Sequence, residues 1–197
     1  MTVIVCIVVA EGIAIAADSR QASASALGHL RVDSDYADKI FPLNSSLGVA
    51  LSGQSFFYTN ANDSPTNVGL LLSGANRYLP KNCSVRKAAS IIHQRIDGVL
   101  KTHNSVVGNS QAGAEFYVVG FDNQSEIGEV YRCQVPGEII LERSTRDAGA
   151  VWGGQGEIID RLVLGYDRRL VDFLGLEQEA EELRKTLSKQ RAKLQLH

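Results

Sequence analysis

Thr2 is the first residue whose type and position could support chemistry, because it directly follows the initiator Met1. If Met1 is removed, a threonine hydroxyl and a free α-amine belong to the same residue. Threonine is a poor nucleophile until a base takes its proton. The pKa of an α-amine is about 7.7–8.0, so part of it is neutral near pH 7–8 and can act as that base. The start of the chain therefore predicts a nucleophile that carries its own base.

Such a nucleophile needs charged partners, and two other segments supply residues of suitable types. Asp18 follows an apolar run, and Lys39 begins another. An ammonium close to Thr2 would lower the pKa of its amine and hydroxyl, and a carboxylate would hold that ammonium in place. Each residue alone has a commoner role, since an aspartate often ends a strand and a lysine often marks a solvated edge. Neither residue by itself therefore predicts a site.

Two apolar hairpins are the elements that must position these residues. The β-branched run from Val3 to Val9 predicts a strand covered on both faces, and Ile13 to Ala17 predicts its return. Residues 39–43 and 47–51 predict a second hairpin, which ends at Ser52-Gly53. The predicted catalytic residues thus stand at the ends of strands.

The rest of the chain predicts helices, then strands, then helices. Residues 19–35 favour a loop or a pair of short irregular strands, and residues 54–80 favour a broken helix. Ser84 is a suitable N-cap for a helix whose apolar face is Val85, Ala88, Ala89, Ile92, Ile96 and Val99. Further strands are predicted at 115–121, 128–134, 137–142 and 148–152, followed by a helix to Leu164 and a helical tail with a leucine seam over 176–194.

This order of elements differs from the regular alternation of strand and helix that parallel α/β folds show. It favours antiparallel sheets covered by helices, which is an α+β fold. A length of 197 residues fits a single domain with a substantial core.

Composition narrows the function further. A net charge of −2 without a basic stripe argues against a nucleic-acid binder. Three cysteines without metal-ligand spacing predict buried thiols of a reducing compartment, and the four histidines are scattered, so we expect no metal or cofactor. The apolar start lacks a basic leader and is too short to span a membrane. We therefore expect a cytoplasmic protein that binds neither membrane nor nucleic acid.

Four segments together resemble a known family. Thr2, Ala17-Asp18-Ser19-Arg20, Asp38-Lys39-Ile40-Phe41 and Ser52-Gly53 are similar to the residue set of proteasome β-subunits, in the bacterial proteasome-like group of N-terminal nucleophile (Ntn) hydrolases. The resemblance covers about residues 2–166. It implies a four-layer αββα sandwich of two antiparallel sheets covered by helices, formed as one domain over residues 1–197, with 167–197 as a divergent helical C-terminus.

The resemblance also implies a role for each residue. Thr2 Oγ would attack a peptide carbonyl with its own amine as general base, which makes the protein a threonine-type endopeptidase. Lys39 would lower the local pKa, Asp18 would pair with Lys39, and the Gly53 N–H would stabilise the oxyanion. Three further residues would support or line the site: Arg20 braces the loop, and Gln21 and Leu51 line the first specificity pocket, where Leu51 suggests a preference for apolar side chains.

The implied partners are a peptide or unfolded-protein substrate and further copies of the chain in a homo-oligomeric ring; no ATPase or other regulator is visible in the sequence. Two departures leave alternatives open. Trp152-Gly153-Gly154 stands where the family has a serine, and no late Arg-Asp…Ser-Gly-Gly segment follows Tyr166. The chain could instead be a catalytically silent structural or assembly subunit, or an Ntn amidohydrolase acting on small non-peptide amides.

The catalytic hypothesis requires that Met1 be removed. We expect the intact mass of the purified protein to be that of residues 2–197, because only then does Thr2 carry a free α-amine. Mass spectrometry of the whole chain checks this. A chain that keeps Met1 has no amine base at Thr2, and that outcome would contradict the hypothesis.

Overall fold

The computed structural model describes residues 2–24, 29–59, 65–108, 112–122 and 126–164, with the single positions 174, 175, 182 and 185. The chain divides into two compact units, Met1–Gly154 and Gln155–His197. The predicted leucine seam over 176–194 lies outside the described residues, apart from two single positions. The single domain over 1–197 stays a prediction.

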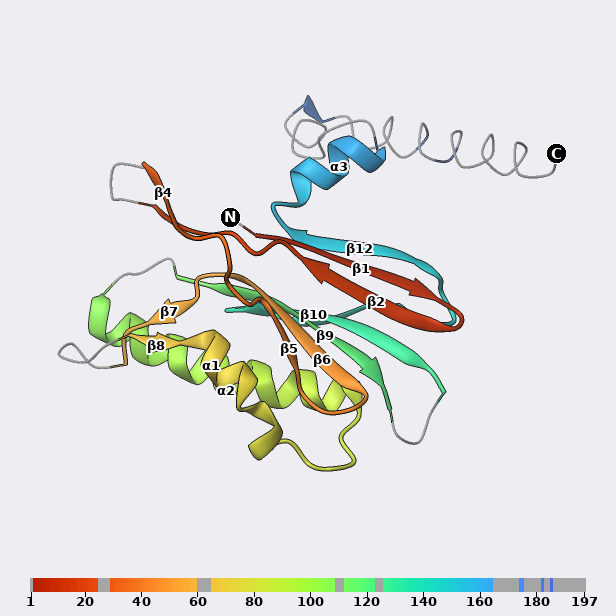
Figure 1. The fold of residues 1–197 in the computed structure, drawn as a ribbon, viewed down its shortest axis with the longest axis horizontal. Helices are drawn as coiled ribbons and strands as arrows, with labels where there is room; N and C mark the ends of the chain where they lie inside the picture. Colours follow the sequence, from red (N-terminus) through yellow and green to blue (C-terminus); the bar gives the residue numbers. More distant parts are fainter. Residues whose placement is uncertain are drawn as a thin grey trace. The chain divides into compact units, whose positions relative to one another are not determined.

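The first sheet holds the start of the chain. It contains β1 (Val3–Val9), β2 (Gly12–Ala17) and β12 (Gly149–Gly154) in the order β12-β1-β2, and both pairings are antiparallel (Figure 1). Val3 pairs with Gly154 on one side, and Ile4 pairs with Ala17 on the other. The predicted hairpin is confirmed, and its register brings the end of β2 to the residue after Thr2.

The second sheet has five antiparallel strands in the order β11-β10-β9-β6-β5. They are β5 (Ile40–Pro42), β6 (Leu47–Gly53), β9 (Ala114–Phe121), β10 (Gly128–Val135) and β11 (Ile139–Ser144). β5 and β6 form the predicted second hairpin. Neighbouring strands are close in sequence except β6 and β9, because the segment between them includes helices.

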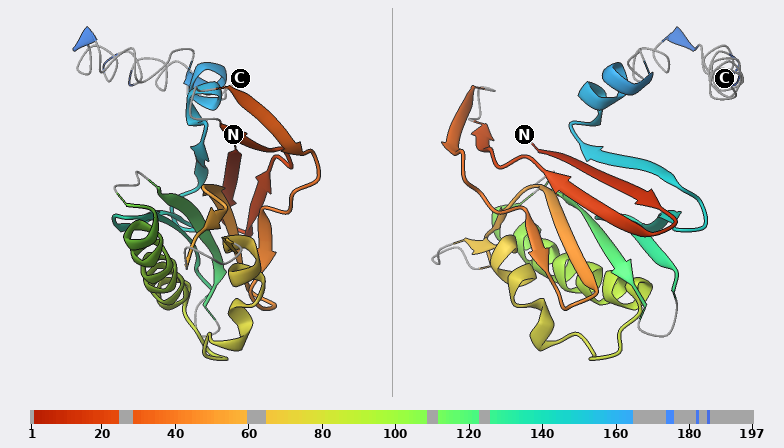
Figure 2. Two further views of the ribbon diagram at one scale, coloured as in Figure 1. Left: turned by 90° about the vertical axis from the view of Figure 1, so that its left-hand side faces the viewer. Right: turned by 45° about the vertical axis from the view of Figure 1, so that its right-hand side comes forward.

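Helix α2 (Val85–Val107) covers one face of the five-stranded sheet, where it contacts β9, β10 and β11 (Figure 2). The side chain of Ser84 accepts a hydrogen bond from the Lys87 N–H at 3.2 Å, so the predicted N-cap is confirmed. The residues of the predicted apolar face are buried, except Val99, which is partly buried. The 3.6-residue periodicity therefore identified the packed face correctly.

The three-stranded sheet packs on the other face of the five-stranded sheet. Ile4, Cys6 and Val8 of β1 point into this second core and are at most 1% exposed, whereas Ile7 and Val9 are 51% and 44% exposed. The prediction that Val3–Val9 is covered on both faces is therefore wrong for the described residues. An unbroken β-branched run does not reveal which of its alternating side chains meet a partner surface.

Within Met1–Gly154 the described elements form three layers: α2, the five-stranded sheet and the three-stranded sheet. The α+β class is thus confirmed as a mixed fold with antiparallel sheets and few helices. The fourth layer of the predicted αββα sandwich is not established, since α3 (Gly156–Leu164) belongs to the second compact unit. None of the described helices is both long and apolar enough to cross a membrane.

The broken helix predicted over 54–80 is wrong in its first half. That part contains the two-residue strands β7 (Phe56–Phe57) and β8 (Thr66–Asn67), followed by α1 (Val68–Ser73) and the 3₁₀ turn η1 (Ala75–Arg77). Phe57 is fully buried, and the Tyr58 N–H donates to His103 Nδ1 at 2.9 Å. These contacts to α2 hold the segment extended, and local sequence does not predict them.

For residues 19–35 we predicted either a loop or a pair of short irregular strands, and the described residues form the pair of strands. β3 (Gln21–Ala24) and β4 (Leu30–Ser34) pair antiparallel, with an irregularity between Gln21 and Ala22. This short ribbon starts three residues after Asp18.

Ile4 and Ile7 offer a matched test of the layer arrangement, because they lie on opposite faces of β1. We expect Ile4→Ala to lower the free energy of unfolding by about 2–5 kcal/mol, because it leaves a cavity between the sheets. Ile7→Ala should cost much less, about 1 kcal/mol or below. Urea unfolding of both variants measures the difference. Equal costs would show that the outer face of β1 is covered in solution.

Candidate active site

Asp18 is fixed at the end of β2 by the backbone of β1. Its N–H donates to the Val3 carbonyl at 3.2 Å, and its Oδ1 accepts the Val3 N–H at 2.8 Å. The register that pairs Ile4 with Ala17 makes this exchange possible. Because Val3 follows Thr2 directly, the Asp18 carboxylate lies beside the backbone of the predicted nucleophile.

Lys39 stands immediately before β5 and points to the same carboxylate. Its Nζ lies 2.9 Å from each oxygen of Asp18, and it donates to the Arg20 carbonyl at 2.6 Å. The Lys39 side chain is 9% exposed, and that of Asp18 is 36% exposed. A nearly buried ammonium of this kind is stable only when paired and hydrogen-bonded. The predicted pairing of Asp18 with Lys39 is present in the structure.

The surroundings of Asp18 keep it ionised. Partial burial by itself raises the pKa of this carboxyl. Hydrogen bonds from the Val3 N–H, Lys39 and the Arg20 N–H, together with the charge of Lys39, lower the pKa by more than burial raises it. The net pKa lies below the ordinary aspartate value. Asp18 is therefore an anion at neutral pH.

A cavity of about 920 Å³ brings the predicted residues together. Thr2, Lys39 and Gly53 all line it, and so do Gln21 and Leu51, the two residues predicted to bind substrate. Leu51 is only 5% exposed, so most of its surface belongs to the core beneath the cavity. The lining also includes carboxylates and hydroxyls to which the sequence analysis gave no role, contributed by Asp33, Asp38, Ser23 and Ser55.

Gly53 can supply a backbone donor to this cavity. The Leu51 N–H donates to the Lys39 carbonyl at 2.9 Å, and strand alternation directs the Gly53 N–H to the same edge of β6, beyond the start of β5. Gly53 has a φ of +89°, and a Cβ there would lie 3.1 Å from the Gly113 carbonyl oxygen. Only glycine fits this position without strain.

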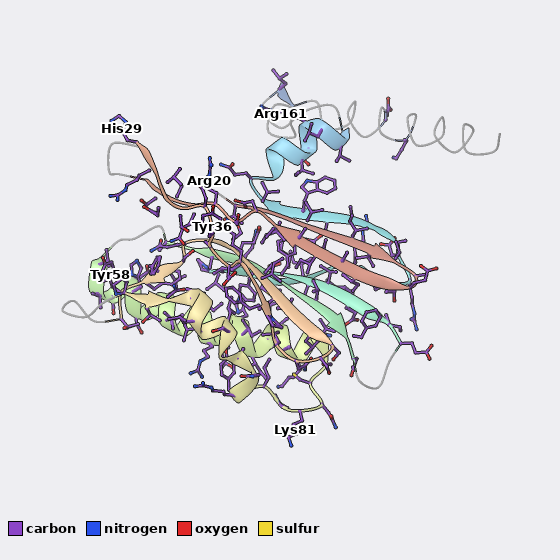
Figure 3. The ribbon with its side chains drawn as sticks, viewed as in Figure 1. Arg20, His29, Tyr36, Tyr58, Lys81 and Arg161 are labelled. Carbon is purple, nitrogen blue, oxygen red and sulfur yellow. The ribbon has the colours of Figure 1, made fainter. Side chains whose placement is uncertain are left out.

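Arg20 lies at the edge of the site rather than in the cavity lining. Its side chain, labelled in Figure 3, forms an ion pair with Asp35 at 2.7 Å, and more than half of each side chain is exposed. The Arg20 backbone binds both members of the ion pair: its N–H donates to Asp18 Oδ2 at 3.1 Å, and its carbonyl accepts a hydrogen bond from Lys39 Nζ. The predicted bracing role of the guanidinium stays a prediction.

The sequence analysis missed Glu115 and the close approach of the β12 end to Thr2. Gly154, at the end of β12, has a φ of +77°, and a Cβ there would overlap the Thr2 carbonyl oxygen. The Gly154 N–H donates to Glu115 Oε1 at 3.0 Å. A signal was present in the sequence, because Glu115 is the one charged residue in the apolar run of β9.

The cysteines and acidic groups define no further site among the residues described. Cys6, Cys83 and Cys133 are buried free thiols, and burial raises the pKa of Cys6 and Cys133 to about 12. No group of three or more His, Cys, Asp or Glu side chains in the described part of the chain is arranged to hold a metal ion.

Comparisons with known proteins support the fold. No family model and no curated protein matches the sequence. Among solved structures, the helical assembly of the Anbu complex from Pseudomonas aeruginosa has 20% identity and a TM-score of 0.58, covering 90% of this chain and 72% of that one. Anbu (ancestral beta-subunit) from Yersinia bercovieri has 19% identity and a TM-score of 0.56, covering 84% and 67%. At such low identity the likeness shows the fold alone.

These findings correct the family resemblance drawn from the sequence. The identification as a member of the bacterial proteasome-like group of Ntn hydrolases is wrong, since the similar structures are Anbu proteins, a proteasome-like but distinct group. Neither a family model nor a curated protein supports the Ntn hydrolase assignment. Four short motifs fix a local arrangement of side chains, but they do not separate related groups that share it.

Asp18→Asn tests the electrostatics of the site. The pKa of Asp18 is lowered in the folded state, so its charge stabilises the fold above the unfolded value of about 3.9, and this contribution is lost as the pH falls through the folded-state pKa. At pH 6–7 we expect the free energy of unfolding to be larger for wild type than for Asp18→Asn. This difference between the two proteins should shrink as the pH is lowered toward 2. Urea unfolding between pH 2 and 7 measures it.

Glu11→Gln, in the exposed β1–β2 turn, controls for the loss of one negative charge. A gap between wild type and Asp18→Asn that stays constant down to pH 2 would contradict the assigned role of the carboxylate.

Proposed function

We propose that this protein is a subunit of a proteasome-like homo-oligomeric assembly and that Thr2, after removal of Met1, hydrolyses amide bonds. The observation that carries the chemical part is the position of the Asp18–Lys39 pair: Asp18 is bonded to the backbone beside Thr2, and Lys39 lines the same cavity as Thr2. The similarity to the Anbu helical assembly supports the assembly part.

The arrangement supports a stepwise mechanism. The α-amine of Thr2 takes the proton of its hydroxyl, and Oγ attacks the carbonyl carbon of the substrate. The Lys39 ammonium lowers the free energy of the negative charge that develops, and Asp18 holds Lys39 in place. The Gly53 N–H donates to the carbonyl oxygen as it becomes an oxyanion. The amine then protonates the leaving nitrogen, and water releases the acyl group from Thr2.

The substrate class follows from the cavity. A volume of about 920 Å³ lies in the range of ligand sites that enclose a whole small molecule or several side chains of a peptide. The lining combines apolar Leu51 and Leu70 with polar Gln21 and Asp38. We propose peptides as the substrates, with small non-peptide amides as the second class that the same chemistry admits.

A catalytically silent assembly subunit is the second candidate, and the end of β12 favours it. The departure noted at Trp152-Gly153-Gly154 places a glycine against the Thr2 carbonyl, so this position contributes no side chain to orient the Thr2 amine. The matched Anbu structures support an assembly role independently of any catalysis.

Substitution of Thr2 separates these candidates. We expect wild type to cleave short fluorogenic peptides, Thr2→Ala to lose at least about a hundredfold in turnover because the nucleophile is gone, and Thr2→Ser to keep measurable activity because the hydroxyl remains. Release of the fluorophore measures turnover, and light scattering on the same samples measures the mass of the assembly.

Three outcomes decide among the candidates. Cleavage of small amides without cleavage of peptides would select the second substrate class. Equal turnover by wild type and Thr2→Ala, with both forming a large assembly, would leave the silent subunit as the function. A monomer in both samples would contradict the assembly part.

A further inference from the structure

Glu115 belongs to a polar network that crosses between the two sheets behind Thr2. It lies at the second position of β9, and its side chain is 22% exposed. Oε1 accepts the Gly154 N–H at 3.0 Å, while Oε2 lies 3.8 Å from Arg132 and 3.5 Å from the amide nitrogen of Gln134. One carboxylate thus joins β9 and β10 of the five-stranded sheet to β12 of the three-stranded sheet.

Arg132 is itself held in place from its other side. Its Nε donates to Glu142 on β11 at 2.5 Å. Burial alone would lower the pKa of Arg132, but the hydrogen bond and charge of Glu142 raise it to a net value above the ordinary one. The guanidinium is therefore a permanent cation that orients the Glu115 carboxylate toward β12.

The end of β12 lies in close contact with both this network and Thr2. A Cβ at Gly153 would overlap the Tyr117 hydroxyl and meet Glu115 Oε1, and a Cβ at Gly154 would overlap the Thr2 carbonyl oxygen. Tyr117 also donates its hydroxyl to the Trp152 carbonyl at 3.2 Å. Because burial and the nearby carboxylates raise the pKa of Tyr117, its hydroxyl remains a donor at all working pH values.

Register links Glu115 to the oxyanion donor as well as to Thr2. In the β6–β9 pairing, Glu115 is opposite Ser52, and Ala114 is opposite Gly53. Opposite residues in a ladder project from the same face of the sheet. The β12 end therefore lies over Ser52 and Glu115 together, and a Cβ at Gly154 would come within 2.9 Å of Ser52 Oγ.

We propose that Glu115 is a positioning residue that sets the distance between Thr2 and the Gly53 donor. By anchoring the Gly154 N–H, it fixes the strand end that packs against the Thr2 carbonyl, and the Val3–Gly154 pairing passes that constraint to β1. This assignment rests on the proposed hydrolysis at Thr2. It also gives a physical role to the glycines at the β12 end, where the family has a serine. A side chain at Gly153 or Gly154 would push β12 away from Glu115 and Thr2.

Glu115→Ala and Glu115→Gln test the assignment. We expect Glu115→Ala to lower kcat about ten- to a hundredfold with a much smaller change in KM, because the substrate cavity stays intact while the reacting groups are displaced. Glu115→Gln should recover part of kcat, since its amide oxygen can still accept the Gly154 N–H. Glu138→Ala, at an exposed position of the β10–β11 turn, is the matched control and should behave as wild type.

Amide hydrogen exchange provides a readout that does not need turnover. We expect the Gly154 and Val3 amides to exchange at least about tenfold faster in Glu115→Ala than in wild type, with α2 unchanged. Unchanged exchange at Gly154 would overturn the assignment, whatever the activity. Faster exchange with an unchanged kcat would overturn it too, because the anchor would then not position the reacting groups.

Failure of the proposed function has a different signature. In that case wild type turns over no faster than Thr2→Ala. The positioning role of Glu115 in hydrolysis is then overturned together with the hydrolysis itself. Amide exchange at Gly154 still tests the hydrogen bond separately, because faster exchange in Glu115→Ala shows that Glu115 holds the end of β12.

Discussion

The ion pair between Asp18 and Lys39 is the interaction on which the rest of the site depends. The carboxylate is bound at the same time by the backbone of β1 and by an ammonium that is almost fully buried. The Lys39 ammonium could not remain at this depth without the Asp18 carboxylate, because an unpaired buried charge costs several kcal/mol. The pair therefore fixes the start of β5 against the end of β2. Thr2 and its cavity lie at that junction.

Close backbone approach is the second constraint. Thr2, Gly53 and the β12 end meet at one end of the two-sheet sandwich, where glycines with positive φ remove the side chains that would keep the strands apart. In the Glu115–Arg132–Glu142 network, the Glu115 carboxylate accepts the Gly154 N–H at this junction. The fold therefore brings these residues together through backbone geometry as well as through side chains.

The similarity to Anbu structures and the chemistry of the site are separate arguments. The fold likeness is to Anbu structures, one of them a helical assembly, whereas the proposal of hydrolysis rests on the charges and distances of the Asp18–Lys39 pair beside Thr2. Three layers are formed within Met1–Gly154, and the outer face of β1 carries exposed Ile7 and Val9. An assembly subunit can carry such a surface, because apolar side chains exposed in one chain can be buried at an interface.

Much of the local structure was determined by the sequence alone. Apolar runs predicted the β1–β2 and β5–β6 hairpins, and helical periodicity with Ser84 predicted α2. The motif resemblance implied that Asp18, Lys39 and Gly53 would gather around Thr2. These features depend on neighbours in sequence or on a few chemically distinctive side chains. Only the tertiary structure decided the extended path of Phe56–Phe57, the covered face of β1 and the anchoring of Gly154 by Glu115. Each of these is fixed by residues tens of positions away, whose packing and hydrogen bonds outweigh local preference.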